Sequence, residues 1–222
     1  MKKILSFILL GATSLVASAQ ISSLDELSTD KAYTIYNPFY TTYAVYNAEK
    51  STSLVWAAGM TASDKTIADQ SYTTPFNAAD PSSSWMIVPF NDQWFVYNLG
   101  AKKFMAVGHT AANASTASAK LQDTPVAVEF TSNGNGGFHL RSYDGNQNFL
   151  CAAPQLSYPI SIWTSADNGS TWKIEENAQV QADYETCMQK LKEAFPETVA
   201  LKIDTRHGYV WSTKKGGPMP ER

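Results

Sequence analysis

Short runs of alternating apolar and polar residues, rich in aromatic side chains, succeed one another between Lys31 and Glu176. Apolar residues at every second position are typical of a β-strand that buries one face. Three such runs lie at positions 32–37, 94–98 and 137–142. A second apolar run follows each of them, at positions 43–46, 104–107 and 149–152. The pattern therefore predicts an all-β domain made of three similar units.

A pair of bulky residues at alternating positions closes each predicted unit. The pairs are Trp85 with Ile87, Val128 with Phe130, and Trp172 with Ile174. The first members of these pairs are 43 and 44 positions apart, and a near-constant period is a strong statement about architecture. Third strands are predicted at positions 53–56, 124–126 and 160–163. We therefore expect four strands in each unit and twelve in the pseudo-threefold domain.

The hydrophobic period changes after the third unit. Apolar residues recur every three or four positions at Val180, Tyr184, Met188, Leu191 and Phe195. This spacing predicts a C-terminal helix within residues 178–196, packed on the β domain rather than reserved for a partner. In the tail, 197–222, apolar and polar residues alternate again on both sides of a short turn, which predicts a hairpin.

The first nineteen residues read as a signal peptide. Lys2 and Lys3 precede a short apolar run at positions 4–16, and Ala17-Ser18-Ala19 forms a cleavage signal. We expect the mature chain to start at Gln20 and to be exported to a periplasm, a cell surface or the extracellular medium. The β domain is then expected to occupy residues 20–177.

Composition narrows the choice of partners. The charged fraction is only 17%, and removing Lys2 and Lys3 takes the formal net charge from -3 to -5. Without a basic cluster, nucleic acid is a poor partner, because binding to phosphates needs concentrated Lys and Arg. No further segment is long and apolar enough for a membrane span. Aromatic residues make up 12% of the chain, which suits a surface that contacts sugars or proteins and equally suits an ordinary β core.

Four short strands in each of three units resemble the β-trefoil, and the closing Trp resembles the ricin B-type lectin version found in secreted bacterial proteins. Units of that family end in Gln-x-Trp. The matching positions here hold Ser83-Ser84-Trp85 and Ser170-Thr171-Trp172, with Val128 in the middle unit. The resemblance covers about residues 30 to 177. It implies a β-trefoil whose closing Trp residues fill the core and whose function is carbohydrate binding.

The resemblance also implies where a sugar would bind. The family uses an Asp after the second strand, an aromatic residue on the third, and a polar residue near the closing turn. The matching residues are Asn47 and Trp56 in the first unit, and Trp163, Asp167 and Asn168 in the third. An aromatic face stacks on the C–H patch of a sugar, while a carboxylate or amide binds its hydroxyls. The alternative is that both Trp residues only pack.

We expect Trp56→Ala to abolish glycan binding and to leave thermal stability almost unchanged. The predicted partner is a glycan or polysaccharide, and a companion hydrolase could be a second partner. Residues 165–172 also match the Asp-box turn of sialidases, which we interpret as local turn chemistry.

Nothing in the sequence indicates an enzyme or a cofactor. His109, His139 and His207 do not pair at metal-ligand spacing, and the pattern places no two carboxylates across a cleft. Two alternatives stay open. One is a protein-interaction or inhibitor-type trefoil whose contact is the predicted long loop 59–84, with Tyr72 and Phe76. The other is the N-terminal remnant of a larger secreted glycoside hydrolase.

The two cysteines leave one further question open. Cys151 lies in a predicted core strand and Cys187 on the predicted helix. Export permits a disulfide between them, but a chain of this length can bury a full core without one.

Overall fold

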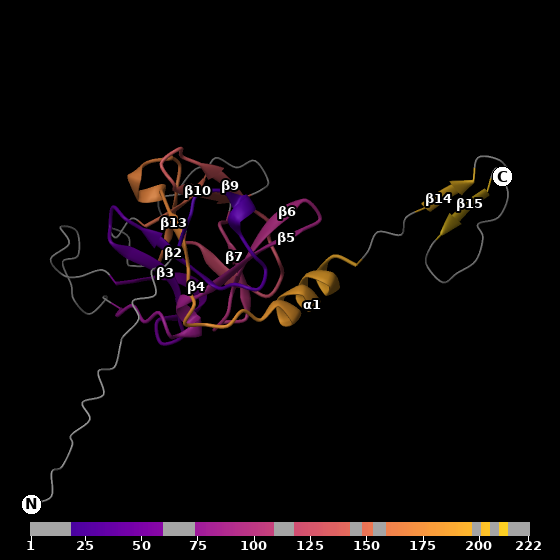
Figure 1. Cartoon of the computed structure of the whole chain (residues 1–222). Coiled ribbons are helices and arrows are strands. Elements are labelled where there is room, and N and C mark those ends of the chain that lie inside the picture. The colour runs from indigo at the N-terminus through magenta and orange to yellow at the C-terminus, as the bar shows by residue number, and fades with distance from the viewer. Residues whose placement is uncertain are drawn as a thin grey trace, which may run out of the picture.

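The computed structural model describes residues 19–59, 74–108, 118–142, 148–152 and 159–196, and the backbone of 201–204 and 209–212. Figure 1 shows a body of β-strands with helix α1 (Tyr184–Ala194) beside it. The fold is therefore all-β with one α-helix, near the C-terminus, among the described residues.

The strands from β2 to β13 follow one another in three runs of four. The first run is β2 (Tyr33–Asn37), β3 (Thr42–Asn47), β4 (Ser51–Ala58) and β5 (Trp85–Phe90). The second is β6 (Gln93–Asn98), β7 (Lys103–Ala106), β8 (Lys120–Gln122) and β9 (Val128–Ser132). The third is β10 (Phe138–Ser142), β11 (Phe149–Cys151), β12 (Ser161–Trp163) and β13 (Lys173–Glu176). A short strand, β1 (Gln20–Ile21), pairs with β13.

Alternation along the sequence explains which face of each strand is buried. In β10, Phe138, Leu140 and Ser142 are buried, whereas His139 and Arg141 are half-buried. Successive side chains of a strand point to opposite faces, so this burial follows the apolar pattern.

The first and fourth strands of the three runs form a closed ring. Within the runs, β2 pairs with β5, β6 pairs with β9, and Phe138 of β10 bridges to Trp172 just before β13. Between the runs, β5 pairs with β6, β9 with β10, and β13 with β2. Closure gives these strands neighbours on both sides, which satisfies their backbone groups.

The third strands meet at one point in a cycle of three backbone hydrogen bonds. Val55 donates to Ala119 O at 2.9 Å, Ala119 donates to Ile160 O at 2.8 Å, and Ile160 donates to Val55 O at 2.8 Å. Three segments, one from each run, are thus joined in a closed cycle.

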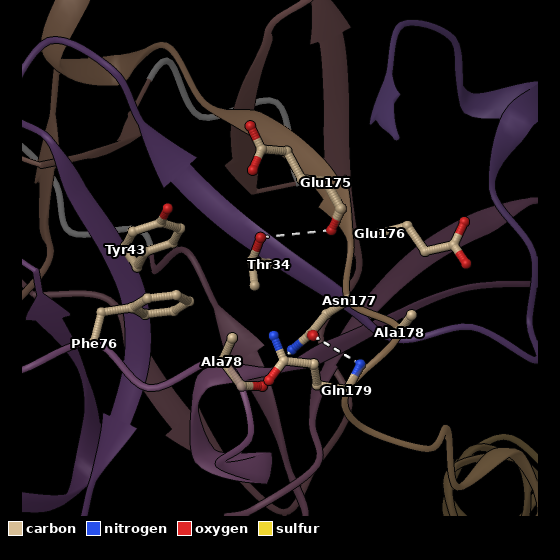
Figure 2. A pocket seen from close by; sticks show the side chains of 9 residues that line it. All are labelled: Thr34, Tyr43, Phe76, Ala78, Glu175, Glu176, Asn177, Ala178 and Gln179. Carbon is tan, nitrogen blue, oxygen red and sulfur yellow. Dashed lines mark hydrogen bonds between the residues drawn. The ribbon is translucent and has the colours of Figure 1, made fainter. Parts of the chain in front are cut away.

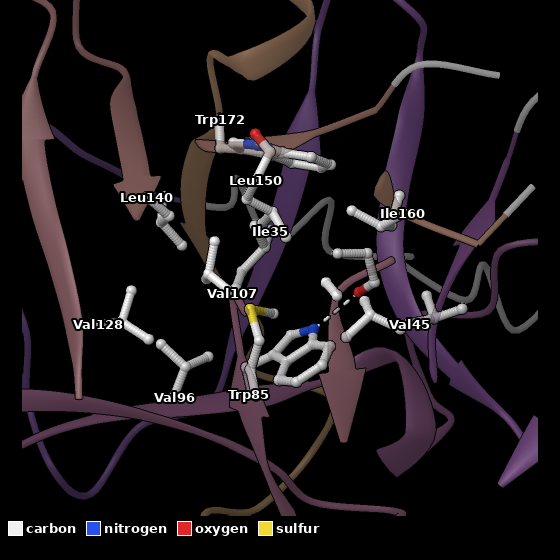
Figure 3. Packing of buried hydrophobic residues seen from close by; sticks show 14 of the residues in the cluster. Ile35, Val45, Trp85, Val96, Val107, Val128, Leu140, Leu150, Ile160 and Trp172 are labelled. Atoms are coloured by element: carbon white, nitrogen blue, oxygen red, sulfur yellow. Dashed lines mark hydrogen bonds between the residues drawn. The ribbon is translucent and has the colours of Figure 1, made fainter. Parts of the chain in front are cut away.

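Two fully buried tryptophans anchor the core (Figure 3). Trp85 Nε1 donates to Ala44 O at 2.7 Å, and Trp172 Nε1 donates to Leu150 O at 2.8 Å. Each bond joins the start of a fourth strand to the second strand of the same run. Val128 is also buried and lines the core at the corresponding place in the second run. The closing residues therefore fill the core, as the resemblance implies.

Helix α1 covers a second hydrophobic core. Asp183 caps its start by accepting a hydrogen bond from the Thr186 amide at 3.3 Å. Cys187 and Leu191 are fully buried in a cluster with strand residues that include Phe95 and Phe104. The helix thus packs on the β domain as predicted, and no helix among the described residues has the length and apolarity to cross a bilayer.

The predicted helical stripe is confirmed at Val180, Met188, Leu191 and Phe195, which all belong to or pack against this cluster. It was wrong at Tyr184, which is 42% exposed, and it missed Cys187, which is buried. Cys151 and Cys187 are both buried and do not form the disulfide that the sequence leaves open.

The predicted third strand at 124–126 was wrong, because the strand is β8, and Pro125 lacks the N–H that a ladder needs. Ahead of β2 lies the 3-10 helix η1 (Leu24–Glu26), where Ser23 and Glu26 form a capping box. In the tail, β14 (Leu201–Asp204) pairs antiparallel with β15 (Tyr209–Ser212), where a hairpin is predicted.

Candidate functional site

The predicted site residue Asn47 is the last residue of β3, at the turn into β4. Its side-chain oxygen accepts hydrogen bonds from the amides of Glu49 at 3.1 Å and Lys50 at 3.2 Å. Its amide nitrogen donates to Thr74 Oγ1 at 3.1 Å. Most of the hydrogen-bonding groups of this side chain therefore hold the turn and the segment that begins at Thr74.

Trp56, which is predicted to stack on a sugar at the same site as Asn47, is buried. It lies in β4 opposite Val45, is 7% exposed, and belongs to the main hydrophobic cluster. A ring in this position has no open face for a sugar, which corrects the expectation that Trp56 is a stacking platform. The reason is that β4 runs through the meeting point of the third strands. Its indole N–H has no acceptor among the described residues.

The third unit presents a strip of half-exposed rings, which we name the aromatic strip: His139, Phe149 and Trp163. Trp163 ends β12 and pairs with Phe149 of β11. Phe149 meets the His139 ring at 5.8 Å with an interplanar angle of 66°. The nitrogen Nδ1 of His139 lies 3.0 Å from Ser170 O, which holds the imidazole in place.

Sequence reasoning singled out only Trp163 in this strip. For His139 and Phe149 the sequence predicts only that they lie in strands, and both strands are confirmed. The alternation of exposed and buried positions is the signal that could have placed these side chains on the same surface, because paired antiparallel strands align their outward faces.

Asp167 and Asn168 lie on the exposed turn before β13. The Asp167 carboxylate caps the 3-10 helix η6 (Asn168–Ser170) by accepting from the Ser170 amide at 3.1 Å. The backbone oxygen of Asn168 accepts from Asn37 Nδ2 at 3.1 Å. Both residues therefore shape the turn, consistent with the interpretation of local turn chemistry, while their side chains stay exposed to solvent.

The same turn occurs before β5, where sequence reasoning missed it. Asp80 caps the 3-10 helix η3 (Pro81–Ser83) by accepting from the Ser82 amide at 2.8 Å. Asp80 precedes Trp85 by the same interval as Asp167 precedes Trp172. This shared spacing between Asp and Trp is the sequence signal that could have predicted the turn before β5.

A buried asparagine from the following run clamps each of these turns. Asn98 Nδ2 donates to Ser82 O at 3.0 Å and Ser84 O at 3.2 Å. Asn37 Nδ2 likewise donates to Gly169 O and Thr171 O, both at 2.9 Å. The clamps fix where one run ends against the next.

A separate pocket of about 160 Å³ lies beside β2 and β3 (Figure 2). Its lining consists of Thr34, Tyr43, Phe76, Ala78, Glu175, Glu176, Asn177, Ala178 and Gln179. Tyr43 and Phe76 stack with ring centroids 3.6 Å apart and an interplanar angle of 11°. Phe76 was predicted as part of a protein-contact loop, but its ring is half-buried against Tyr43; Tyr72 of that loop lies outside the described residues.

Burial raises the pKa of the Tyr43 hydroxyl, and the nearby Glu175 carboxylate raises that pKa further. Glu176 on the other side forms an ion pair with Lys31 at 2.7 Å. The pocket thus has an aromatic wall, a phenol that stays protonated and two carboxylates. No sequence signal marked it, since its residues come from segments far apart in the chain.

The described residues contain no group of three or more His, Cys, Asp or Glu side chains that could hold a metal ion.

Comparisons with known proteins rest on structure alone, because no protein-family model and no curated protein matches the sequence. A ricin B-like lectin from Macrolepiota procera, solved in complex with lactose, superposes with a TM-score of 0.51 at 14% identity. The match covers 67% of this chain and 97% of the lectin.

A mosquitocidal holotoxin superposes with a TM-score of 0.50 at 12% identity, over 68% of this chain. The match spans only 18% of the holotoxin. At such low identity these likenesses establish the fold alone. The chain has the β-trefoil fold that the sequence predicts, which is also the fold of the ricin B-like lectin.

Proposed function

We propose that this chain is a secreted, non-catalytic carbohydrate-binding module. The observation that carries the proposal is the fold shared over nearly the whole length of a lectin that was solved with lactose. Lectins of this kind bind without catalysis, and the described residues offer aromatic and polar groups suited to sugars. Targeting a companion hydrolase to its glycan would be the biological use of such a module.

We also propose that the three runs are three units of a pseudo-threefold, twelve-strand trefoil. The cycle of hydrogen bonds among Val55, Ala119 and Ile160 supports this symmetry. The matching bonds of Trp85 and Trp172 to the second strands of their runs support it too. A trefoil of this kind has three equivalent surfaces, and each can diverge separately in its ligand contacts.

The third-unit site, which includes Trp163 of the aromatic strip, is the better of the two sequence-predicted sites. Trp163 is half-exposed, and the exposed side chains of Asp167 and Asn168 follow it on the next turn. We propose Trp163 as the stacking residue and these two polar side chains as hydroxyl contacts. The first-unit pair is not part of this proposal, because Trp56 is buried and the Asn47 side chain holds a turn.

Export belongs to the same proposal. β1 begins at Gln20, immediately after the predicted cleavage site, and pairs with β13. Gln20 Nε2 also donates to Gly136 O at 2.7 Å, so the first residue of the expected mature chain contributes to the fold. N-terminal sequencing of the exported protein should begin at Gln20, and a retained leader would contradict this part.

A glycan array probed with the mature chain tests the proposed function. Trp163→Ala should weaken binding at least tenfold, because stacking on the indole face is lost. Trp94→Ala is the matched control, since Trp94 is also half-buried but packs on Phe130 outside the strip. Equal loss in both variants would contradict the site. A folded wild-type chain that binds no glycan would contradict the function.

A further inference from the structure

The pocket beside β2 and β3 contains none of the residues that the sequence singled out for sugar binding. Three parts of the fold contribute to it: strands β2 and β3, the segment around Phe76, and the segment that leads from β13 toward α1. We propose that this pocket binds one terminal sugar ring of a glycan, with Glu175 and Tyr43 as the polar contacts. The inference rests on the proposed function and gives it a second site.

The size of the pocket fits one ring rather than a longer chain. Its volume of about 160 Å³ is below the range of pockets that hold drug-sized ligands. A cavity of about 150 Å³ accommodates one six-membered ring, as shown by benzene in an engineered cavity. A single pyranose at the end of a glycan is therefore the class of ligand that matches the space.

The lining supplies both kinds of contact that a pyranose uses. The Glu175 carboxylate and the Tyr43 hydroxyl lie toward the same end of the pocket (Figure 2). A carboxylate accepts from two hydroxyls, and a phenol both donates and accepts. Phe76 and the methyl group of Ala78 provide apolar surface for the C–H side of the ring.

Glu175 and Glu176 differ in what they already bind. Glu176 is engaged by Lys31 at 2.7 Å. The Glu175 carboxylate makes no ion pair and no side-chain hydrogen bond with the described residues, although it is half-buried. A half-buried charge has lost part of its hydration, so ligand hydroxyls would replace water at little cost.

The walls of the pocket are held in place before any ligand arrives. Asn177 Nδ2 donates to Ala78 O at 2.7 Å and Ser84 Oγ at 2.8 Å, and its side-chain oxygen accepts from the Gln179 amide at 3.1 Å. The stack of Tyr43 on Phe76 fixes the opposite wall. Preorganisation of this kind reduces the entropy lost on binding.

Amide NMR spectra of the mature chain, titrated with methyl glycosides of glucose, galactose and N-acetylglucosamine, test the inference. At least one glycoside should shift the backbone amides of Phe76, Glu175 and Gln179. Glu175→Gln should weaken that binding about tenfold, because a charged acceptor is lost while its shape is kept. Glu49→Gln, the same change on an exposed turn, should bind like the wild type.

The outcomes separate the pocket from the proposed function. Shifts confined to the aromatic strip, with array binding lost in Trp163→Ala, would overturn the pocket and leave the function standing. Absence of any shift in a folded chain that also fails on the array would overturn both. Equal affinity of wild type and Glu175→Gln would overturn the role of the carboxylate. An unchanged melting temperature in Glu175→Gln ensures that lost binding does not reflect unfolding.

Discussion

Trp56 and Trp163 occupy corresponding third strands but have different surroundings. Trp56 is 7% exposed and packs where the third strands meet, whereas Trp163 is half-exposed at the end of β12. Residue type and strand position are alike in the sequence, so only packing separates the two. Burial therefore places the Trp56 ring in the core and leaves part of the Trp163 ring in contact with solvent.

Trp56→Ala should destabilise the protein by about 3–5 kcal/mol, because it opens a cavity in the core. This reverses the sequence-based expectation of nearly unchanged stability. Trp163→Ala should cost less than about 1 kcal/mol, since much of its ring already contacts solvent. Urea unfolding of both variants measures the difference, and equal losses would contradict the assignment.

Cys187 makes the free energy of unfolding depend on pH in the alkaline range. Burial of this α1 residue against the strands raises the pKa of its thiol from 9.0 to about 12. Asp183 makes a smaller contribution in the same direction, and Lys190 opposes it. Between these two values the unfolded chain releases the thiol proton and the native chain retains it. Raising the pH therefore favours unfolding in this window, by at most about 1.4 kcal/mol per pH unit.

The free energy of unfolding should accordingly fall as the pH rises from about 9 to about 12. Tyr97, whose pKa is also raised by burial, contributes in the same direction. Cys187→Ala should show a shallower slope in urea titrations over this range. Parallel slopes for wild type and variant would show that the thiol is not the titrating group.

At the scale of elements, the clamps between runs form a small set of related contacts. Asn37 and Asn98 end the first strands of two runs, and each donates to carbonyls of the turn that closes the preceding run. The third run has Ser142 at this place, facing the end of the second run, where Val128 replaces the closing Trp. The asparagine clamp, the capped turn and the closing Trp thus occur together at two junctions between runs and are replaced together at the third.

Asn37→Ala and Asn98→Ala should each destabilise the fold by about 1–3 kcal/mol, because buried carbonyls lose their donors. Ser142→Ala should cost less than about 1 kcal/mol, since one hydroxyl cannot reproduce the amide contacts. Differential scanning calorimetry of the three variants tests the ranking. A Ser142 variant as unstable as the asparagine variants would refute the idea of an unequal third junction.

Strand-level features could be predicted well because they depend on local alternation. The closing residues Trp85, Val128 and Trp172 and most strands lie where the sequence places them. The third strand of the second run was misplaced because its register depends on pairing with β4 and β7, not on its own residues. Propensity over three residues is too weak to fix such a strand.

The pocket could not be predicted for a different physical reason. Thr34 and Glu175, which meet through a hydrogen bond of 3.5 Å, are 141 positions apart in sequence. Each residue reads as an ordinary strand position, and only closure of the ring by β13 on β2 brings them together. The predictions for Trp56 and Trp163 rest on residue type and strand position, which do not show whether a ring is buried.

At the scale of the whole molecule, the domain extends beyond the trefoil. Helix α1 buries Leu191 and Cys187 against the outer faces of β5, β6 and β7. Among the strand residues of this cluster, Met86, Phe95 and Phe104 have 0–1% exposure with the helix in place. The trefoil therefore depends on the helix to cover a large apolar surface, which an isolated domain would expose to water.

A mature chain that ends at Asn177 should be less stable than one that ends at Pro196, and should bind a hydrophobic dye. Truncation removes the cover from the second core, and burial of each large side chain is worth about 1.5–3 kcal/mol. Thermal unfolding and dye fluorescence of the two chains measure the effect, and the longer chain is the control because it keeps α1. If both chains melted alike and bound no dye, the helix would be an appendage, and the β-trefoil alone would be the folding unit.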